Sequence, residues 1–306
     1  MELYLPIAEM SVHWLMILGM GAAVGFLSGV FGIGGGFLLI PLLIFAGIPP
    51  GVAVATTASQ ISASTFSGVI AHFRQRTVDV KMGAVMLAGG LTGTALGVYI
   101  FGLLRARGQS EFVVAISYVI LLGSVGGLML TESIRTIRDI RAGKSAGGRK
   151  PGQHNWIHGL PFKLRFRRSR LYISVFPPLV LGFIVGVLSA IMGVGGGFIM
   201  VPVMIYMLRM PTNIVVGTSL LQVQFVTASA TILHAVDNYT VDIMLAFLLI
   251  LGGVVGAQFG VRAGAKLRGE QLRFLLALLA LAIAVRLLYG LIVTPPDLFS
   301  LTIGGT

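Results

Sequence analysis

The chain has 306 residues, of which 56% are hydrophobic and only 10% are charged. So much apolar surface excludes a soluble globular protein of this length, because one compact core could not bury it. The absence of cysteine excludes disulfides, thiol catalysis and cysteine-ligated metals. The composition predicts an integral membrane protein, and we expect no cofactor and no metal.

Apolar runs follow one another along the chain at 12–47, 51–71, 82–104, 112–130, 173–208, 214–233, 241–261 and 272–294. Most contain the roughly 20 residues that a helix needs to cross a hydrocarbon core of about 30 Å. Their Gly, Ala and Leu content lacks the alternation of barrel strands. We therefore expect an all-α polytopic membrane protein, located in a bacterial-type inner (cell) membrane.

The formal net charge of +12 is concentrated in residues 132–170, which hold eleven Lys and Arg against Glu132 and Asp139. A basic segment between membrane spans is typical of a cytoplasmic loop near anionic lipids, and we favour this interpretation over a nucleic-acid site. The sequence thus predicts three parts. These are a first transmembrane repeat (1–131), a basic cytoplasmic linker (132–172) and a second transmembrane repeat (173–306).

The two membrane parts match each other in sequence. FGIGGGFLLIP at 31–41 matches MGVGGGFIMVP at 192–202, and the later Thr-Val-Asp at 77–79 matches that at 240–242. Repeated halves with glycine-interrupted helices at corresponding positions are typical of secondary transporters.

The first apolar run is too long for one crossing, since a helix over 12–47 would measure about 54 Å. If it crosses only up to its glycines and then turns back, each half has an odd number of crossings. Most Lys and Arg residues then lie on one side, as the positive-inside rule requires. We therefore expect inverted repeats with about 8 to 10 membrane segments, broken or re-entrant helices at the GxGGG motifs, and both termini outside.

The two glycine triplets favour helix breaks over packing contacts, because glycine reaches positive φ and consecutive glycines suit a turn. The N–H groups that open the next half-helix then face the break, where an anion can bind without a charged side chain. Close packing is the better explanation for two other sets of glycines at four-residue spacing. These are Gly89, Gly93, Gly97, Gly252, Gly256 and Gly260.

Hydroxyl and amide side chains occupy the run after each motif and offer donors to an anion, although hydrogen bonds between helices are an equal alternative. The predicted substrate-binding residues are Gly34, Gly35, Gly36, Phe37, Thr56, Thr57, Gln60, Gly195, Gly196, Gly197, Phe198, Thr218, Ser219, Gln222 and Arg286. Arg286 would add a positive charge at depth, or else extend to the interface. Candidates for proton coupling, or for interfacial anchoring, are His72, Asp79, His234 and Asp242.

The doubled motif at Gly32–Pro41 and Gly193–Pro202, with Ala55-Thr56-Thr57 and Gly217-Thr218-Ser219 after it, resembles the sulfite exporter TauE/SafE family of membrane transporters. The resemblance extends from about Gly21 to Tyr289 and leaves out the basic linker. It implies transport, usually outward, of a small sulfur-containing anion such as sulfite or sulfoacetate.

The leading functional prediction is a secondary transporter that moves a small anion by alternating access around a midplane site between the two repeats. A passive anion channel is the alternative, since the same donors would serve it. An intramembrane enzyme is disfavoured because the sequence has no H-E-x-x-H or G-x-S-x-G motif. Oligomeric state is not specified by the sequence.

Overall fold

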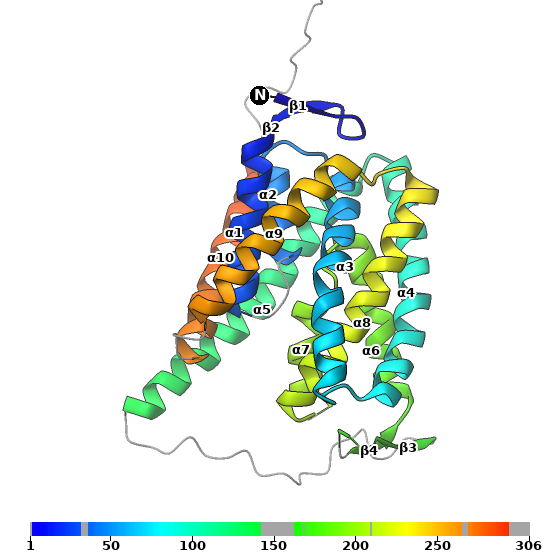
Figure 1. The fold of residues 1–306 in the computed structure, drawn as a ribbon, viewed down its shortest axis with the longest axis vertical. Coiled ribbons are helices and arrows are strands. Elements are labelled where there is room, and N and C mark those ends of the chain that lie inside the picture. Colours follow the sequence, from blue (N-terminus) through cyan, green and yellow to red (C-terminus); the bar gives the residue numbers. More distant parts are fainter. Residues whose placement is uncertain are drawn as a thin grey trace, which may run out of the picture.

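A computed structural model describes residues 2–31, 36–141, 162–166, 168–169, 171–208, 210–264 and 269–293. Gly34 and Gly35 of the predicted site, and residues 142–161 of the predicted linker, lie outside these ranges. The described chain is mostly helical, with ten α-helices, one short π-helix and two β-hairpins (Figure 1).

Both membrane parts follow the same order of elements. The first part contains β1 (Glu2–Leu5), β2 (Met10–His13), α1 (Trp14–Phe31), α2 (Gly36–Phe45), α3 (Pro50–Arg74), α4 (Val80–Ala106) and α5 (Ser110–Arg141). The second part, counted here with the end of the predicted linker, contains β3 (Lys163–Phe166), β4 (Leu171–Ser174), α6 (Phe176–Met192), α7 (Gly197–Tyr206), α8 (Thr212–Leu233), η2 (His234–Asn238), α9 (Ile243–Gly264) and α10 (Gly269–Ile292). Each part is a hairpin, a broken helix pair and three longer helices.

Within the described ranges, five helical segments are long and apolar enough to cross a membrane. They are Val80–Ala106, Ser110–Arg135, Ile214–Asn238, Ile243–Gly260 and Phe274–Ile292. Three shorter apolar segments accompany them: Trp14–Ser28, Gly36–Phe45 and Phe176–Met192. The chain is therefore a multi-pass membrane protein, as its composition predicts.

The two hairpins are absent from the all-α prediction. In β1–β2, Glu2 pairs with His13, and in β3–β4, Lys163 pairs with Ser174, both in antiparallel register. Strands of four residues are too short for a hydrophobic alternation to be recognised beside long apolar runs. The hairpins lie at opposite ends of the molecule (Figure 1).

Glycines bring helices from the two parts into close contact, α1 with α9 and α4 with α6. A Cβ atom on Gly93 would lie 2.1 Å from the carbonyl oxygen of Phe183, and one on Gly256 would lie 2.0 Å from that of Ala22. Only glycine permits backbones to approach so closely. This confirms the packing interpretation of the glycines at four-residue spacing.

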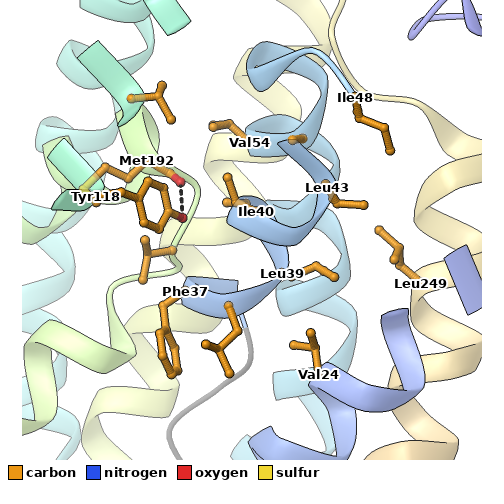
Figure 2. Packing of buried hydrophobic residues seen from close by; sticks show 14 of the residues in the cluster. Val24, Phe37, Leu39, Ile40, Leu43, Ile48, Val54, Tyr118, Met192 and Leu249 are labelled. Carbon is orange, nitrogen blue, oxygen red and sulfur yellow. Dashed lines mark hydrogen bonds between the residues drawn. The ribbon is translucent and has the colours of Figure 1, made fainter. Parts of the chain in front are cut away.

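The short helix α2 lies inside the main hydrophobic core (Figure 2). Its residues from Gly36 to Pro41 are all buried, as is Leu43. Around them lie Val24 of α1, Val54 of α3 and Leu249 of α9. A helix that is apolar on every side is stable only when other helices surround it, and the two parts together provide that enclosure.

We expect Gly25→Ala to destabilise the fold, because its Cβ would lie 2.2 Å from the carbonyl oxygen of Gly253. Overpacking of this kind costs about 1–3 kcal/mol. Gly19→Ala, on the same helix, is the matched control, since nothing lies within 4 Å of its Cβ position. Thermal unfolding in detergent should show a lower midpoint for Gly25→Ala only. Equal midpoints would contradict the close packing of α1 on α9.

Candidate anion site at the helix breaks

The second glycine motif interrupts its helix. α6 ends at Met192, and Gly193, Gly195 and Gly196 have φ of +68°, +76° and +75°. Side chains rarely tolerate these angles, so the sequence of glycines dictates the turn. α7 then starts at Gly197. The break predicted at this motif is confirmed. In the first motif, α1 ends at Phe31 and α2 begins at Gly36.

The break leaves a group of amide donors free. Among the described residues, none accepts a hydrogen bond from the amide N–H groups of residues 194–198, and the first bonds of α7 run from the Ile199 and Met200 N–H groups to the Gly196 carbonyl. The first N–H groups of a helix point away from it, at the positive end of its dipole. The break thus offers several aligned donors without a cationic side chain.

The two motifs meet in the interior. The rings of Phe37 and Phe198 stack with centroids 4.4 Å apart and an interplanar angle of 16°. Ile61 of α3 contacts both motifs, since its side chain lies 2.2 Å from a Cβ position on Gly36 and 2.9 Å from one on Gly195. In this conformation, the glycines from the two parts of the chain enclose a packed apolar contact.

Some buried polar side chains have no hydrogen-bond partner among the described residues. Within the described part of the chain, the unpaired atoms are Thr57 Oγ1, Ser189 Oγ, Thr240 Oγ1 and both amide atoms of Gln222. A buried polar group without a partner costs about 1–3 kcal/mol, so such groups are typical of sites where a ligand completes the bonding.

Ser189 borders the second break, and Gln222 lies near the preceding turn of α6. The Cβ of Ser189 lies 4.0 Å from the Cβ position of Gly196. Gln222 Nε2 lies 3.2 Å from the Cβ position of Gly90, and Gly90 contacts Gly186, one turn before Ser189 on α6. The sequence prediction included Gln222 but omitted Ser189, although Ser189 matches Ser28 when the two halves are aligned.

Thr56 and Thr218 each accept a hydrogen bond at the start of a helix in the other part of the chain, α9 and α4 respectively. Thr56 Oγ1 accepts a hydrogen bond from the Asp242 N–H at 3.1 Å, and Thr218 Oγ1 accepts one from the Asp79 N–H at 3.0 Å. Ser219 donates to the Val216 carbonyl at 3.0 Å. The structure thus gives these three predicted ligands partners within the protein. Gln60 is 7% exposed, with Nε2 2.8 Å from the Cβ position of Gly253.

Asp79 anchors the second hairpin. Its Oδ1 accepts the Met82 N–H at 3.2 Å and so caps α4, while Oδ2 accepts the Ser169 N–H at 2.9 Å and the Ser169 hydroxyl at 2.7 Å. Ser169 lies in the turn between β3 and β4. Both side chains are buried.

Asp242 anchors the first hairpin in the same way. Its Oδ1 accepts the N–H groups of Met244 and Leu245, both at 3.0 Å, at the start of α9. Its Oδ2 accepts the N–H of Ile7, in the turn between β1 and β2, at 3.1 Å. Asp79 and Asp242 are therefore hairpin anchors, each linking a turn to the start of a helix in the other part of the chain.

The two candidate histidines differ in their surroundings. His72 Nδ1 lies 2.8 Å from Thr77 Oγ1. His234 is fully buried, with Nε2 3.0 Å from the Ala190 carbonyl oxygen and Nδ1 3.0 Å from Asn238 Nδ2. Among the described residues, neither histidine forms an ion pair with the aspartate that it accompanies in sequence.

Tyr118 and His234 together hold the end of α6. The Tyr118 hydroxyl donates to the Met192 carbonyl at 2.9 Å (Figure 2), and His234 contacts the Ala190 carbonyl. The last carbonyl groups of a helix have no partners within it, so these side chains supply them. Sequence reasoning missed Tyr118, because one tyrosine in an apolar run gives no sign of its partner.

The structure does not bring Arg286 to the other predicted residues. Its guanidinium lies over the ring of Phe45, 5.3 Å from the ring centroid. Phe45 ends α2, eight residues after Phe37, or about 12 Å along the helix. Of the predicted residues, Gly195, Gly196, Gly197 and Phe198 form the second break, and Gly36 and Phe37 contact it.

We expect Asp79→Asn to release the β3–β4 turn, because an amide presents a donor to the Ser169 N–H. The chain contains no cysteine, so Ser169→Cys creates a unique thiol at a position 1% exposed. Labelling by a membrane-impermeant maleimide should accelerate about tenfold when Asp79→Asn is added, since one hydrogen bond to a charged group is worth about 1.5–3 kcal/mol. Asp242→Asn, which alters the other anchor, should leave this rate unchanged.

A different outcome for these two variants would contradict the assignment of Asp79 as the anchor of the β3–β4 turn. If both variants accelerate labelling equally, the loss of either carboxylate loosens the whole molecule and Asp79 does not specifically hold the turn.

Comparison with known proteins identifies relatives along nearly the whole chain. A family model described as "Sulfite exporter TauE/SafE" matches residues 17–287. "Probable membrane transporter protein YjnA" of Bacillus subtilis (strain 168) is 30% identical over 275 residues, covering 89% of this chain and 98% of the relative. "Probable membrane transporter protein YunE" of the same strain is 25% identical over 288 residues, covering 92% and 98%.

A plant relative matches a shorter segment. "Sulfite exporter TauE/SafE family protein 6" of Arabidopsis thaliana is 52% identical over 56 residues, covering 18% of this chain and 13% of the relative. No solved structure matches the chain.

Proposed function

Because the chain belongs to the sulfite exporter TauE/SafE family of membrane transporters, we propose that it is a secondary transporter that exports a small anion. Sulfite, or an organosulfonate such as sulfoacetate, is the proposed substrate. The observation that carries this proposal is the second helix break, where N–H groups without acceptors among the described residues lie beside Ser189, whose hydroxyl also lacks a described partner.

The donors at the break suit an oxyanion. Sulfite and sulfonate groups carry three oxygens that accept hydrogen bonds, and they lose water when they enter an apolar interior. The N–H groups of residues 194–198, Ser189 and Gln222 replace that water, while the dipole of α7 stabilises the negative charge. Thr57, Gly36 and Phe37 complete the site from the first part of the chain.

Substrate entry requires the contact between the two motifs to open. Phe37 and Phe198 are 2% and 1% exposed, and their stacked rings occupy the place where the motifs meet. We interpret the structure as a closed conformation. Separation of the two rings, one from each repeat, gives the anion access to the N–H groups beside Phe198.

Inverted repeats provide the alternating access. In support, α2 lies toward the end of the molecule that carries β1–β2, and α7 lies toward the end that carries β3–β4 (Figure 1). In the proposed arrangement, each broken helix pair enters from one side and returns to it. The end with β3–β4 and the basic linker faces the cytoplasm, near anionic lipids.

We expect the two hairpin anchors to take part in the transport cycle, one at each end of the molecule. Asp79 and Asp242 each join a hairpin to helices of the opposite repeat, so movement between the repeats strains the bonds at one end at a time. Proton coupling through these aspartates, His72 or His234 requires their present hydrogen bonds to open during transport.

We expect Gln222→Leu to reduce anion flux without loss of stability. Leucine removes a buried amide that has no partner among the described residues, so folding loses no hydrogen bond while substrate loses a donor. Gln224→Leu is the matched control on the same helix. Gln224 bonds Thr65 Oγ1 at 2.8 Å and Ser62 Oγ at 3.1 Å, so its loss should lower the unfolding midpoint and leave the substrate KM unchanged.

The measurement is uptake of labelled sulfite, sulfoacetate, sulfate and chloride into proteoliposomes, with and without a proton gradient. We expect Gln222→Leu to raise KM or lower kcat/KM by about tenfold, the effect of losing one hydrogen bond to a charged ligand. Wild-type flux in Gln222→Leu and Gly196→Leu would refute the site. Saturation with counterflow supports a carrier, whereas flux that does not saturate indicates the passive channel.

A further inference from the structure

A pocket of about 610 Å³ lies away from the helix breaks. It is formed by the end of α2, the turn into α3, the start of α5 and the end of α10. This is the end of the molecule near β1–β2, since the Cβ position of Gly47 lies 3.7 Å from the Met10 side chain of β2. The pocket lining is mostly apolar, with Glu111 and Arg286 as its two charged residues.

The part of the chain that the structure describes offers no partner to the two charges in this pocket. Both side chains are exposed, and neither forms an ion pair or hydrogen bond with another described residue. The guanidinium of Arg286 lies over the face of Phe45, 5.3 Å from the ring centroid. A charged side chain on a membrane helix requires a counter-charge, water or a lipid headgroup. An unpaired cation and an unpaired anion in one pocket match a ligand that carries both charges.

The surface below the pocket faces lipid. On α5, the exposed side chains of Phe112, Ile116 and Ile120 recur every four residues and form one stripe that starts at the pocket. On α10, Leu278 and Val285 are 52% and 64% exposed and lie deeper than Arg286. α5 and α10 pack against each other, and both stripes extend from the pocket end of these helices toward their opposite ends.

We propose that this pocket binds the headgroup of a zwitterionic phospholipid. The guanidinium of Arg286 binds the phosphate, and the carboxylate of Glu111 binds the amine of an ethanolamine headgroup. The acyl chains lie along the exposed apolar stripes of α5 and α10. This site is independent of the proposed transport site.

The position of Arg286 fits a headgroup contact. It lies six residues before the end of α10 at Ile292, or about 9 Å along the helix, a distance that a snorkelling arginine covers. A free small anion would gain the same contact with Arg286, but it would meet the like charge of Glu111 in the same pocket. An amine on the ligand turns that repulsion into attraction.

Native mass spectrometry of the detergent-purified protein tests the proposal. We titrate with phosphatidylethanolamine and phosphatidylglycerol, and compare wild type, Arg286→Gln, Glu111→Gln and Arg262→Gln, an exposed arginine on α9 as control. Wild type should bind phosphatidylethanolamine more tightly. Arg286→Gln should weaken binding of both lipids about tenfold, and Glu111→Gln should remove the preference between them. Arg262→Gln should match wild type.

Two results would overturn the proposal. One is equal lipid binding by wild type and Arg286→Gln. The other is displacement of bound phosphatidylethanolamine by sulfite, which would make the pocket a binding site on the path of the transported anion. Absence of anion flux in the transport assay would count against the proposed function only, because lipid binding is measured without transport.

Discussion

A backbone amide inside a membrane must find a partner, because lipid offers no hydrogen bonds. The break after Met192 therefore requires hydrogen-bond partners from the surrounding structure. On its carbonyl side, Tyr118 and His234 supply donors to the end of α6. On its N–H side, no described residue supplies an acceptor for residues 194–198. In the proposed function, this difference between the two sides of one turn is what suits the break to an anion.

The two parts of the chain interleave around the break. α1 packs on α9, α4 on α6, α3 on α8 and α5 on α10, so each principal contact joins an early helix to a late one. The glycine faces allow the first two contacts to be close, and the bonds from Asp79 and Asp242 to Thr218 and Thr56 fix the ends of α4 and α9. The stacked rings of Phe37 and Phe198 lie where the interleaved parts meet.

The sequence predicts the features that depend on backbone freedom or hydrophobicity. Consecutive glycines from Gly195 to Gly197 predict the break, because positive φ is a local property of the residue. Regular glycine spacing likewise predicts the helix contacts. The hairpins could not be recognised, since their stability depends on distant aspartates. Thr56 illustrates the same limit: its type and depth suit a ligand, but its bond to Asp242 arises only from the tertiary fold. The charge of Arg286 likewise suits an anion site, but the tertiary fold places this side chain over Phe45, away from the break.

The distance in sequence between Ile7 and Asp242 shapes how the molecule is made. The first hairpin leaves the ribosome 235 residues before its anchor, and the glycine face of α1 also waits for α9. The nascent first part therefore enters the membrane with an unpaired turn and an uncovered helix face. The second hairpin differs, because Asp79 precedes Ser169 by 90 residues and is already inserted when that turn is synthesised. The first hairpin is thus secured only once the start of α9 has been made.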